Sequence, residues 1–320
     1  MTRATGRKSL VLHLGVVALL FLLQFVLPEY HHLTVTRIMI LAVFALGYNV
    51  LFGYTGLLSL GHAMFFACGL YAAGLTVYHL GWDVLPAFLF AVAVAGAAAA
   101  AVGMIALRTT GVAFMIVTLM FSQVVYLATL YFSRYTRGDE GLVLPARARS
   151  FELVGIHVNL ADPVTRYYIA LGLLAAGILV VHRLVRSGTG REWIAVRENE
   201  SRTRMLGYNT FSIKLKALTV SGALSGAAGA AYALLFAYVG STFASIQYSI
   251  DALLFTLLGG AGTVLGPVLG SFIMFYLIDI FSEYTTAYLL ATGVVLILLI
   301  LYFSVGILGT LRRKWLHWLP

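Results

Sequence analysis

The residues of this 320-residue chain that could do chemistry are concentrated in one segment, residues 188–210, GTGREWIAVRENESRTRMLGYNT. Its charged residues are Arg191, Glu192, Arg197, Glu198, Glu200, Arg202 and Arg204. Apolar stretches long enough to span a membrane flank the segment on both sides. Since an arginine at the centre of a bilayer costs about 2.5–3.5 kcal/mol, the segment must face water. Its excess of arginine places that water on the cytoplasmic side.

The polar segment has the pattern of two short amphipathic helices. Trp193 and Val196 are three residues apart and share a helical face. Asn199 is suited to cap a second helix that begins near Glu200, and Gly207 to end it in a left-handed C-cap. We expect Trp193 to be exposed and to enter a groove of a soluble partner. The alternative is a helix pair on the membrane surface held by lipid phosphates, but the mixture of charges favours a protein partner.

Catalytic and metal-binding motifs are absent from the sequence. It has no Walker A loop, no G-x-S-x-G and no H-E-x-x-H, so we expect no enzyme, no cofactor and no metal site. The composition is 61% hydrophobic and 10% charged. Because soluble domains carry about 25% charged residues, this is an integral membrane protein. The net charge of +9 does not indicate nucleic-acid binding, since short loops between apolar segments hold the positive residues.

The apolar segments that flank the polar one predict an all-α, polytopic fold with about ten membrane spans, some short or broken, in a single domain over 1–320. We expect spans near 10–27, 34–52, 62–80, 84–107, 110–132, 165–186, 214–240, 246–259, 264–281 and 287–309. The first is read as uncleaved, since no cleavage site follows it. Most Lys and Arg residues then lie on the cytoplasmic side, with both termini. The segment 246–259 is short, because fourteen helical residues reach only about 21 Å.

Two glycine-rich segments interrupt the hydrophobic pattern, at 53–74 and 259–270. The candidate structural glycines are Gly53, Gly56, Gly61, Gly259, Gly260, Gly262 and Gly266. Glycine permits turns with positive φ and lets helices approach closely. These segments therefore predict either tight helix packing or broken helices beside a transport path. A polar segment at 133–164, which contains TRGDEG, is predicted to be an extracytoplasmic loop.

Polar residues inside apolar spans are candidates to line a translocation path. They are Asn49, Ser59, His62, Thr118, Gln123, Asp251 and Thr256. Asn49 and Gln123 are expected to face the interior of the bundle. For His62 a local hydrogen bond is favoured over metal binding, and for Asp251 a structural role near a helix N-terminus is favoured over substrate contact. No chain of acidic residues runs through the spans, which disfavours a self-contained secondary carrier or channel.

Five stretches of the sequence resemble one family in the family's own order. They are GYTGLLSLGHAMFFACGLYAAG at 53–74, ALRTTGVAFMIVTLMFSQVVYLA at 106–128, TRGDEGL at 136–142, GREWIAVRENESRTRMLGYN at 190–209 and LLGGAGTVLGPVLGSF at 257–272, and FSVGILG precedes a basic tail. Together they resemble M-type permease subunits of branched-chain amino acid ABC importers of the LIV-I class. One position departs from the family pattern: Arg137 stands where a second glycine is common, which puts the loop conformation in question.

The resemblance implies a permease subunit of the bacterial inner membrane that holds no catalytic residues. Its partners would be a homologous H-type permease, two cytoplasmic ATPase subunits that hydrolyse ATP, a periplasmic solute-binding protein and membrane lipid. The ATPase-coupling residues would be Gly190, Arg191, Trp193, Arg197, Glu198, Asn199, Glu200 and Gly207. The solute would be a branched-chain amino acid, or urea, an amide or a small carboxylate. The rival hypotheses are a secondary carrier or channel and a membrane-embedded enzyme.

Overall fold

The fold is known from a computed structural model that describes residues 3–145, 150–153, 156–284, 286–303 and 305–314. The first half contains α1 (Arg3–Leu23), α2 (Glu29–Asn49) with a π-helical extension η1 (Val50–Tyr54), α3 (Ala63–Leu80), α4 (Val84–Ala106), α5 (Val112–Tyr131) and α6 (Ser133–Thr136). The second half contains α7 (Pro163–Arg186), α8 (Gly188–Met205), α9 (Thr210–Phe236), the 3₁₀ helix η3 (Ser241–Ala244), α10 (Ile246–Gly259), α11 (Gly266–Tyr284), α12 (Tyr288–Tyr302) and α13 (Ile307–Lys314).

The predicted all-α, polytopic fold is confirmed. Within the described residues, seven helices are long and apolar enough to cross a membrane: His31–Tyr54, Ala63–Leu80, Val84–Ala106, Val112–Tyr131, Pro163–Arg186, Thr210–Phe236 and Gly266–Tyr284. Three shorter apolar helices, Leu10–Leu23, Ile246–Gly259 and Leu290–Leu299, coincide with the remaining predicted spans. The segment predicted to be short, 246–259, is the fourteen-residue helix α10.

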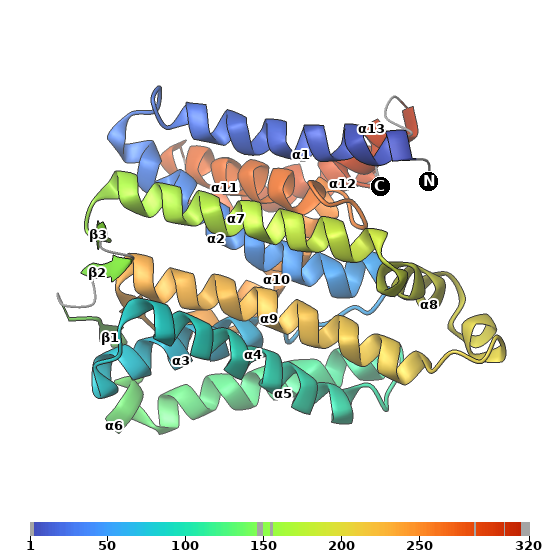
Figure 1. Ribbon diagram of the computed structural model, residues 1–320, viewed down its shortest axis with the longest axis horizontal. Helices are drawn as coiled ribbons and strands as arrows, with labels where there is room; N and C mark the ends of the chain where they lie inside the picture. The colour runs from blue at the N-terminus through green and yellow to red at the C-terminus, as the bar shows by residue number, and fades with distance from the viewer. Residues whose placement is uncertain (1–2, 146–149, 154–155, 285, 304, 315–320) are drawn as a thin grey trace.

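The helices run side by side in one bundle, with α2 and α9 at its centre (Figure 1). The most apolar window of the α2 helix is 89% buried, against 22% for α5 at the periphery. A stripe of small residues lets α9 reach this position: a Cβ on Gly229 would collide with the carbonyl of Phe66 on α3, and one on Gly226 with the Ala95 side chain on α4. Glycine is required at both positions, because only a residue without a side chain fits at such distances.

Short strands lie at the end of the bundle opposite α8 (Figure 1). β1 (Leu142–Val143) pairs antiparallel with β4 (Tyr238–Val239), and β2 (Ser150–Leu153) with β3 (Ile156–Asn159). β1 and β4 join the predicted loop 133–164 to the end of α9, and the Ser241 hydroxyl donates to Asp139 Oδ1 at 3.0 Å. The loop is therefore packed onto the bundle.

Arg137 adopts a backbone conformation that glycine adopts more readily than other residues. Its φ is +58°, in the left-handed region. Its guanidinium donates to the Tyr78 hydroxyl at 3.1 Å and lies 5.9 Å from the centre of the Tyr78 ring. The arginine side chain therefore makes a contact with α3 that offsets part of the backbone cost of this conformation.

Gly259→Ala is expected to destabilise the protein by about 3 kcal/mol or more, because a Cβ at this position would overlap the backbone carbonyl of Gly266 and neither helix can yield without unpacking. Gly293→Ala on α12 is the matched control, since a Cβ there meets no atom within 4 Å. There the substitution should be neutral or slightly stabilising. Thermal unfolding of the two purified variants checks this, and equal melting temperatures would contradict the packing argument.

Candidate functional site

The polar helix α8 is two helices joined at a bend, as the sequence predicts. Asn199 has non-helical angles (φ −162°, ψ 99°), and its side-chain Oδ1 accepts a hydrogen bond from the Arg202 N–H at 2.8 Å. Gly207 has φ +89°. The N–H of Tyr208 reaches back to the carbonyl of Thr203 at 3.3 Å, which is the closing bond of a Schellman motif. Both predicted caps are confirmed.

The prediction that Trp193 is exposed is wrong. Its side chain is 0% exposed and that of Val196 is 5% exposed, and both belong to the main core of the bundle. Spacing places the two side chains on one helical face correctly, but the protein's own spans cover that face. Gly190 shows how close the packing is, because a Cβ there would collide with the carbonyl of Val185 on α7. Trp193 therefore anchors α8 to the bundle, and Arg191 and Glu198 lie on its exposed side.

The exposed apolar surface of this region lies instead at the far end of α8, where the helix stands away from the bundle (Figure 1). Met205, Leu206 and Tyr208 are 81%, 72% and 50% exposed. We call these three residues the apolar tip. Sequence reasoning missed them, although three apolar residues around a C-cap glycine in an otherwise polar segment are a usable signal. Exposed apolar residues clustered in this way are typical of a protein contact.

Glu200 ties the second half of α8 to the start of α9. Its carboxylate lies 2.7 Å from the Lys214 ammonium, which is buried, and 3.5 Å from the exposed guanidinium of Arg204. Partial burial alone would raise the pKa of Glu200, but the hydrogen bond and charge of Lys214, with smaller contributions from Thr210 and Arg204, outweigh it and leave the pKa below its ordinary value. The carboxylate is therefore stabilised as the charged partner of a buried lysine.

Glu200→Gln is expected to destabilise the α8–α9 hairpin by about 2 kcal/mol, because it leaves Lys214 buried without a counter-charge. A lowered carboxylate pKa gives stability that is present above the unfolded pKa of about 4.3 and lost as the pH falls through the folded value. The protection of the hairpin against hydrogen exchange, measured relative to the intrinsic rate at each pH, should therefore fall in acid in the wild type. In Glu200→Gln the protection should already be low at neutral pH, and Glu200→Gln with Lys214→Met should regain part of it. Equal exchange in all three would contradict this role of the pair.

Asn49, at the end of α2 just before the first glycine-rich segment, is bonded to the second, although its partner Thr263 is 214 positions away in the sequence. Its side chain is 0% exposed. Its Nδ2 donates to the Thr263 carbonyl at 2.9 Å, and its Oδ1 accepts from the Gly262 N–H at 2.9 Å. One amide thus satisfies both a donor and an acceptor of the turn between α10 and α11. The predicted inward orientation of Asn49 is confirmed.

Arg197 connects α8 to the end of α2 and to the turn between α10 and α11. Its Nη1 donates to the carbonyl of Gly53, in the π-helical turn that ends α2. A Cβ on Gly262 would lie 2.8 Å from this nitrogen, and one on Gly56 would lie 3.1 Å from Arg197 Cγ. The guanidinium therefore lies against both glycine-rich segments. We call Asn49, Gly53, Arg197 and Gly262 the junction, since these residues join α8, α2 and the α10–α11 turn.

The predicted structural glycines divide into two groups. Gly56, Gly260 and Gly262 have positive φ. Gly53, Gly61, Gly259 and Gly266 have ordinary φ, but a Cβ at each would collide with a neighbouring backbone or side-chain atom. The first group forms turns and the second permits close approach, so both of the predicted uses of glycine occur.

His62 belongs to a second buried node, beside the junction. The Ser221 hydroxyl donates to the Gly47 carbonyl at 2.5 Å, so its oxygen accepts from His62 Nε2 at 3.0 Å. The Tyr48 hydroxyl donates to the Ser59 carbonyl at 3.0 Å. His62 and Ser59 are both 0% exposed. His62 therefore makes a hydrogen bond, but to α9, 159 positions away in the sequence, and not the local bond that was favoured.

The other predicted path residues lie in different environments. Thr118 and Thr256 are buried, and their hydroxyls donate to backbone carbonyls, Thr118 to Met115 at 2.9 Å and Thr256 to Ala252 at 2.8 Å. Gln123 on α5 is half-buried. Asp251 is half-buried on α10, near rather than at the helix start, and its Oδ1 accepts from Gln247 at 3.2 Å. Only Gln123 and Asp251 of the seven reach the surface in this conformation.

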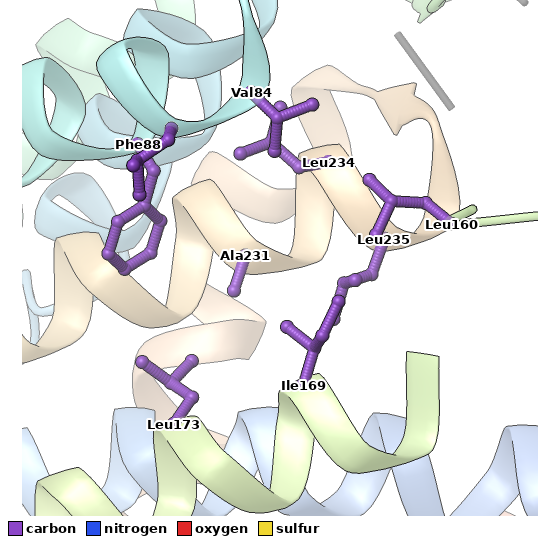
Figure 2. A pocket seen from close by; sticks show the side chains of 9 residues that line it. Val84, Phe88, Leu160, Ile169, Leu173, Ala231, Leu234 and Leu235 are labelled. Atoms are coloured by element: carbon purple, nitrogen blue, oxygen red, sulfur yellow. The ribbon is translucent and has the colours of Figure 1, made fainter. Parts of the chain in front are cut away.

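Two cavities in the described part of the chain are apolar. One, of about 250 Å³, lies between α4, α7 and α9 and is lined by side chains such as Phe88, Leu173 and Leu234 (Figure 2). The other, of about 480 Å³, lies between α1, α11 and α13 and is lined by side chains such as Leu12 and Phe272. Neither offers a hydrogen bond to a polar solute.

Comparison with known proteins identifies the family. A family model described as the permease component of branched-chain amino acid transport systems matches residues 32–305. The chain is 30% identical over 300 residues to LivM of Salmonella typhimurium, a high-affinity branched-chain amino acid transport system permease protein, and the match covers 87% of this chain and 70% of the relative. Identity to LivM of Escherichia coli is 30% over 304 residues, with the same coverage.

A second kind of permease is also similar. The match to LivH of Escherichia coli is 22% identical over 284 residues and covers 84% of this chain and 91% of the relative. No solved structure matches the chain. The family match spans most of the sequence, including the junction, α8 and the predicted path residues. This multi-pass membrane protein therefore belongs to the family of permease components of branched-chain amino acid transport systems.

Proposed function

We propose that the chain is the M-type permease subunit of an ATP-driven importer in the bacterial inner membrane. It would pair with an H-type permease, dock two cytoplasmic ATPases through α8 and its counterpart, and receive solute from a periplasmic binding protein. The solute would be a branched-chain amino acid or a related small polar solute. The observation that supports this most directly is α8, which is fixed to the junction by Arg197 and presents the apolar tip away from the bundle.

The arrangement of α8 suits the transmission of motion. Its inner face is held by Trp193, and Arg197 contacts the glycine-rich segments that end α2 and separate α10 from α11. A partner that moves the apolar tip would therefore displace these two segments as well. ATP hydrolysis would occur in the partner, and this chain would supply no reacting group.

The orientation of the chain in the membrane is inferred from the end of the molecule that holds α8. α8 lies at the end where α1 begins, and α13 lies there too (Figure 1). Arg183 and Arg186 are in the last turn of α7, which leads directly into α8 with its own arginines. By the orientation rule this end faces the cytoplasm, with both termini, and the loop 133–164 faces outward.

We place the solute path between this chain and the second permease, since the two apolar cavities are unsuited to a polar solute. Two exposed polar residues support this placement. They are Arg37 on α2, which lies 5.6 Å from the Phe236 ring, and Gln247 on α10, which donates to the half-buried Asp251.

A charged side chain that faces hydrocarbon costs about 2.5–3.5 kcal/mol, so surfaces that carry Arg37 and Asp251 are better suited to water or protein than to lipid. Asp251 is accordingly the strongest of the predicted path residues. The five enclosed ones become accessible only if helices separate during transport.

The apolar tip gives the test. Leu206→Asp should abolish co-purification of the ATPase subunits with the tagged permease and reduce solute uptake at least tenfold, because burial of a leucine side chain contributes about 1.5–3 kcal/mol and the variant would bury an unpaired charge instead. Val143→Asp is the control, since Val143 is 62% exposed at the opposite end of the bundle. Normal co-purification by Leu206→Asp would remove the tip from the interface. Uptake by this chain alone in liposomes would show a self-contained carrier instead.

A further inference from the structure

A basic cavity of about 330 Å³ lies at the end of α7, beside α1, and the proposed function does not use it. It is lined by Leu10, Leu179, His182, Arg183, Arg186 and Ser187. Both arginines are exposed, and neither makes an ion pair within the described part of the chain. Two unpaired guanidinium groups at one cavity form a site for an anion.

The floor of the cavity holds a polar group that has no partner. His182 is 5% exposed, and its Nδ1 has no hydrogen-bond partner among the described residues. The ring of His13 on α1 packs against it edge-on, with 4.8 Å between the ring centres. Because buried polar atoms are almost always hydrogen-bonded, a polar group bound in the cavity could serve as a partner for this lining residue.

The position of the cavity matches the headgroup layer of a membrane. α7 has 24 residues, about 36 Å of helix, which exceeds the roughly 30 Å hydrocarbon core. Arg183 and Arg186 are in its last turn, so they lie at the depth of lipid phosphates. Leu10 and Leu179 supply an apolar wall on the same cavity, as the start of an acyl chain requires.

We propose that this cavity binds the phosphate of an anionic phospholipid, with Arg183 and Arg186 as its ligands. No carboxylate is among the lining residues, so nothing there would pair with the ammonium of a zwitterionic headgroup. The site therefore selects lipids with a net negative charge, such as phosphatidylglycerol. Ser187, which caps the N-terminus of α8, places the positive end of that helix at the same cavity.

The test uses the full-length chain, with whatever subunits co-purify, in phosphatidylcholine nanodiscs that contain a small fraction of spin-labelled phosphatidylglycerol. The wild type should hold the labelled lipid in preference to labelled phosphatidylcholine. Arg183→Gln with Arg186→Gln should weaken this preference by roughly tenfold or more, since each arginine near an anionic headgroup contributes about fivefold. Arg191→Gln with Arg202→Gln removes the same charge from exposed positions on α8 and should leave the preference unchanged.

Three results would overturn the proposal. An equal loss in both double variants would show diffuse surface attraction instead of a site, and an unchanged preference in Arg183→Gln with Arg186→Gln would exclude these ligands. Displacement of the labelled lipid by millimolar inorganic phosphate would show a site for free phosphate. If the double variant cannot be purified, Arg186→Gln alone should lose about half of the effect on a logarithmic scale. None of these readouts depends on ATPase docking, so the proposed function can fail independently.

Discussion

Arg197→Ala is expected to reduce solute uptake by one to two orders of magnitude while the assembled complex continues to hydrolyse ATP. Arg197 is the residue of α8 whose side chain donates to the carbonyl of Gly53 and lies against Gly262. A hydrogen bond from a charged donor contributes about 1.5–3 kcal/mol, and 1.4 kcal/mol corresponds to a factor of ten. Without it, movement of α8 would no longer be passed to the two glycine-rich segments.

The control for this variant is on the same helix. The Arg202 side chain is exposed. Its contact with the bend at Asn199 is made by its backbone N–H, which an alanine would keep. Arg202→Ala should therefore transport normally. Arg197→Lys keeps the charge but loses the planar fork, so we expect intermediate uptake. Uptake and ATPase activity measured on the same proteoliposomes separate uncoupling from loss of assembly. If Arg197→Ala and Arg202→Ala transported equally well, α8 would not act through the junction.

The helices were predictable because long apolar segments leave few alternatives in a membrane. Every backbone polar group must be satisfied within the segment, so each apolar stretch becomes a helix. The caps of α8 were predictable for a similar reason, since the hydrogen bonds of Asn199 and Gly207 are local. The short length of α10 was also predictable, because the apolar segment between Ser245 and Gly260 has only fourteen residues.

Contacts between distant segments were not predictable in the same way. The spacing of Trp193 and Val196 defines an apolar face, but periodicity does not say whether the face meets a partner or the protein's own bundle. Its burial depends on how α7 and α9 leave the membrane, which is a property of the whole fold. The apolar tip was missed although the sequence carries a signal for it, because the exposure of Met205 and Leu206 also depends on their position beyond the bundle.

The junction lies between these two cases. Asn49 is conspicuous in an apolar segment, and the two glycine-rich segments are conspicuous as interruptions. Nothing in the sequence states that they meet, because the bonds from Asn49 to Gly262 and Thr263 join residues 213 and 214 positions apart. The role predicted for Asn49 was to line a path, and that prediction stays open. What the structure adds is a second role that does not depend on the solute.

Asn49→Leu is expected to destabilise the protein by about 2–6 kcal/mol. The substitution is similar in volume, so the cost comes from polar groups. It leaves the Gly262 N–H and the Thr263 carbonyl buried without partners, and each unsatisfied group costs about 1–3 kcal/mol. Asn49→Asp should be damaging in a different way. It keeps an oxygen that accepts from Gly262, but it replaces the amide donor with a second acceptor that faces the Thr263 carbonyl.

Thr256→Val distinguishes this effect from a general intolerance of buried substitutions. Thr256 is also 0% exposed and lies on the neighbouring α10, but its hydroxyl donates at 2.8 Å to the Ala252 carbonyl of its own helix and only at 3.4 Å to the Ala45 carbonyl on α2. Both carbonyls lie inside helices and keep their helical hydrogen bonds when the hydroxyl is removed, so the cost should stay below about 1 kcal/mol. Thermal unfolding of the three variants provides the comparison. If Asn49→Leu melted at the same temperature as Thr256→Val, the amide would not hold α2 to the turn between α10 and α11, and the junction would not provide a rigid route for coupling.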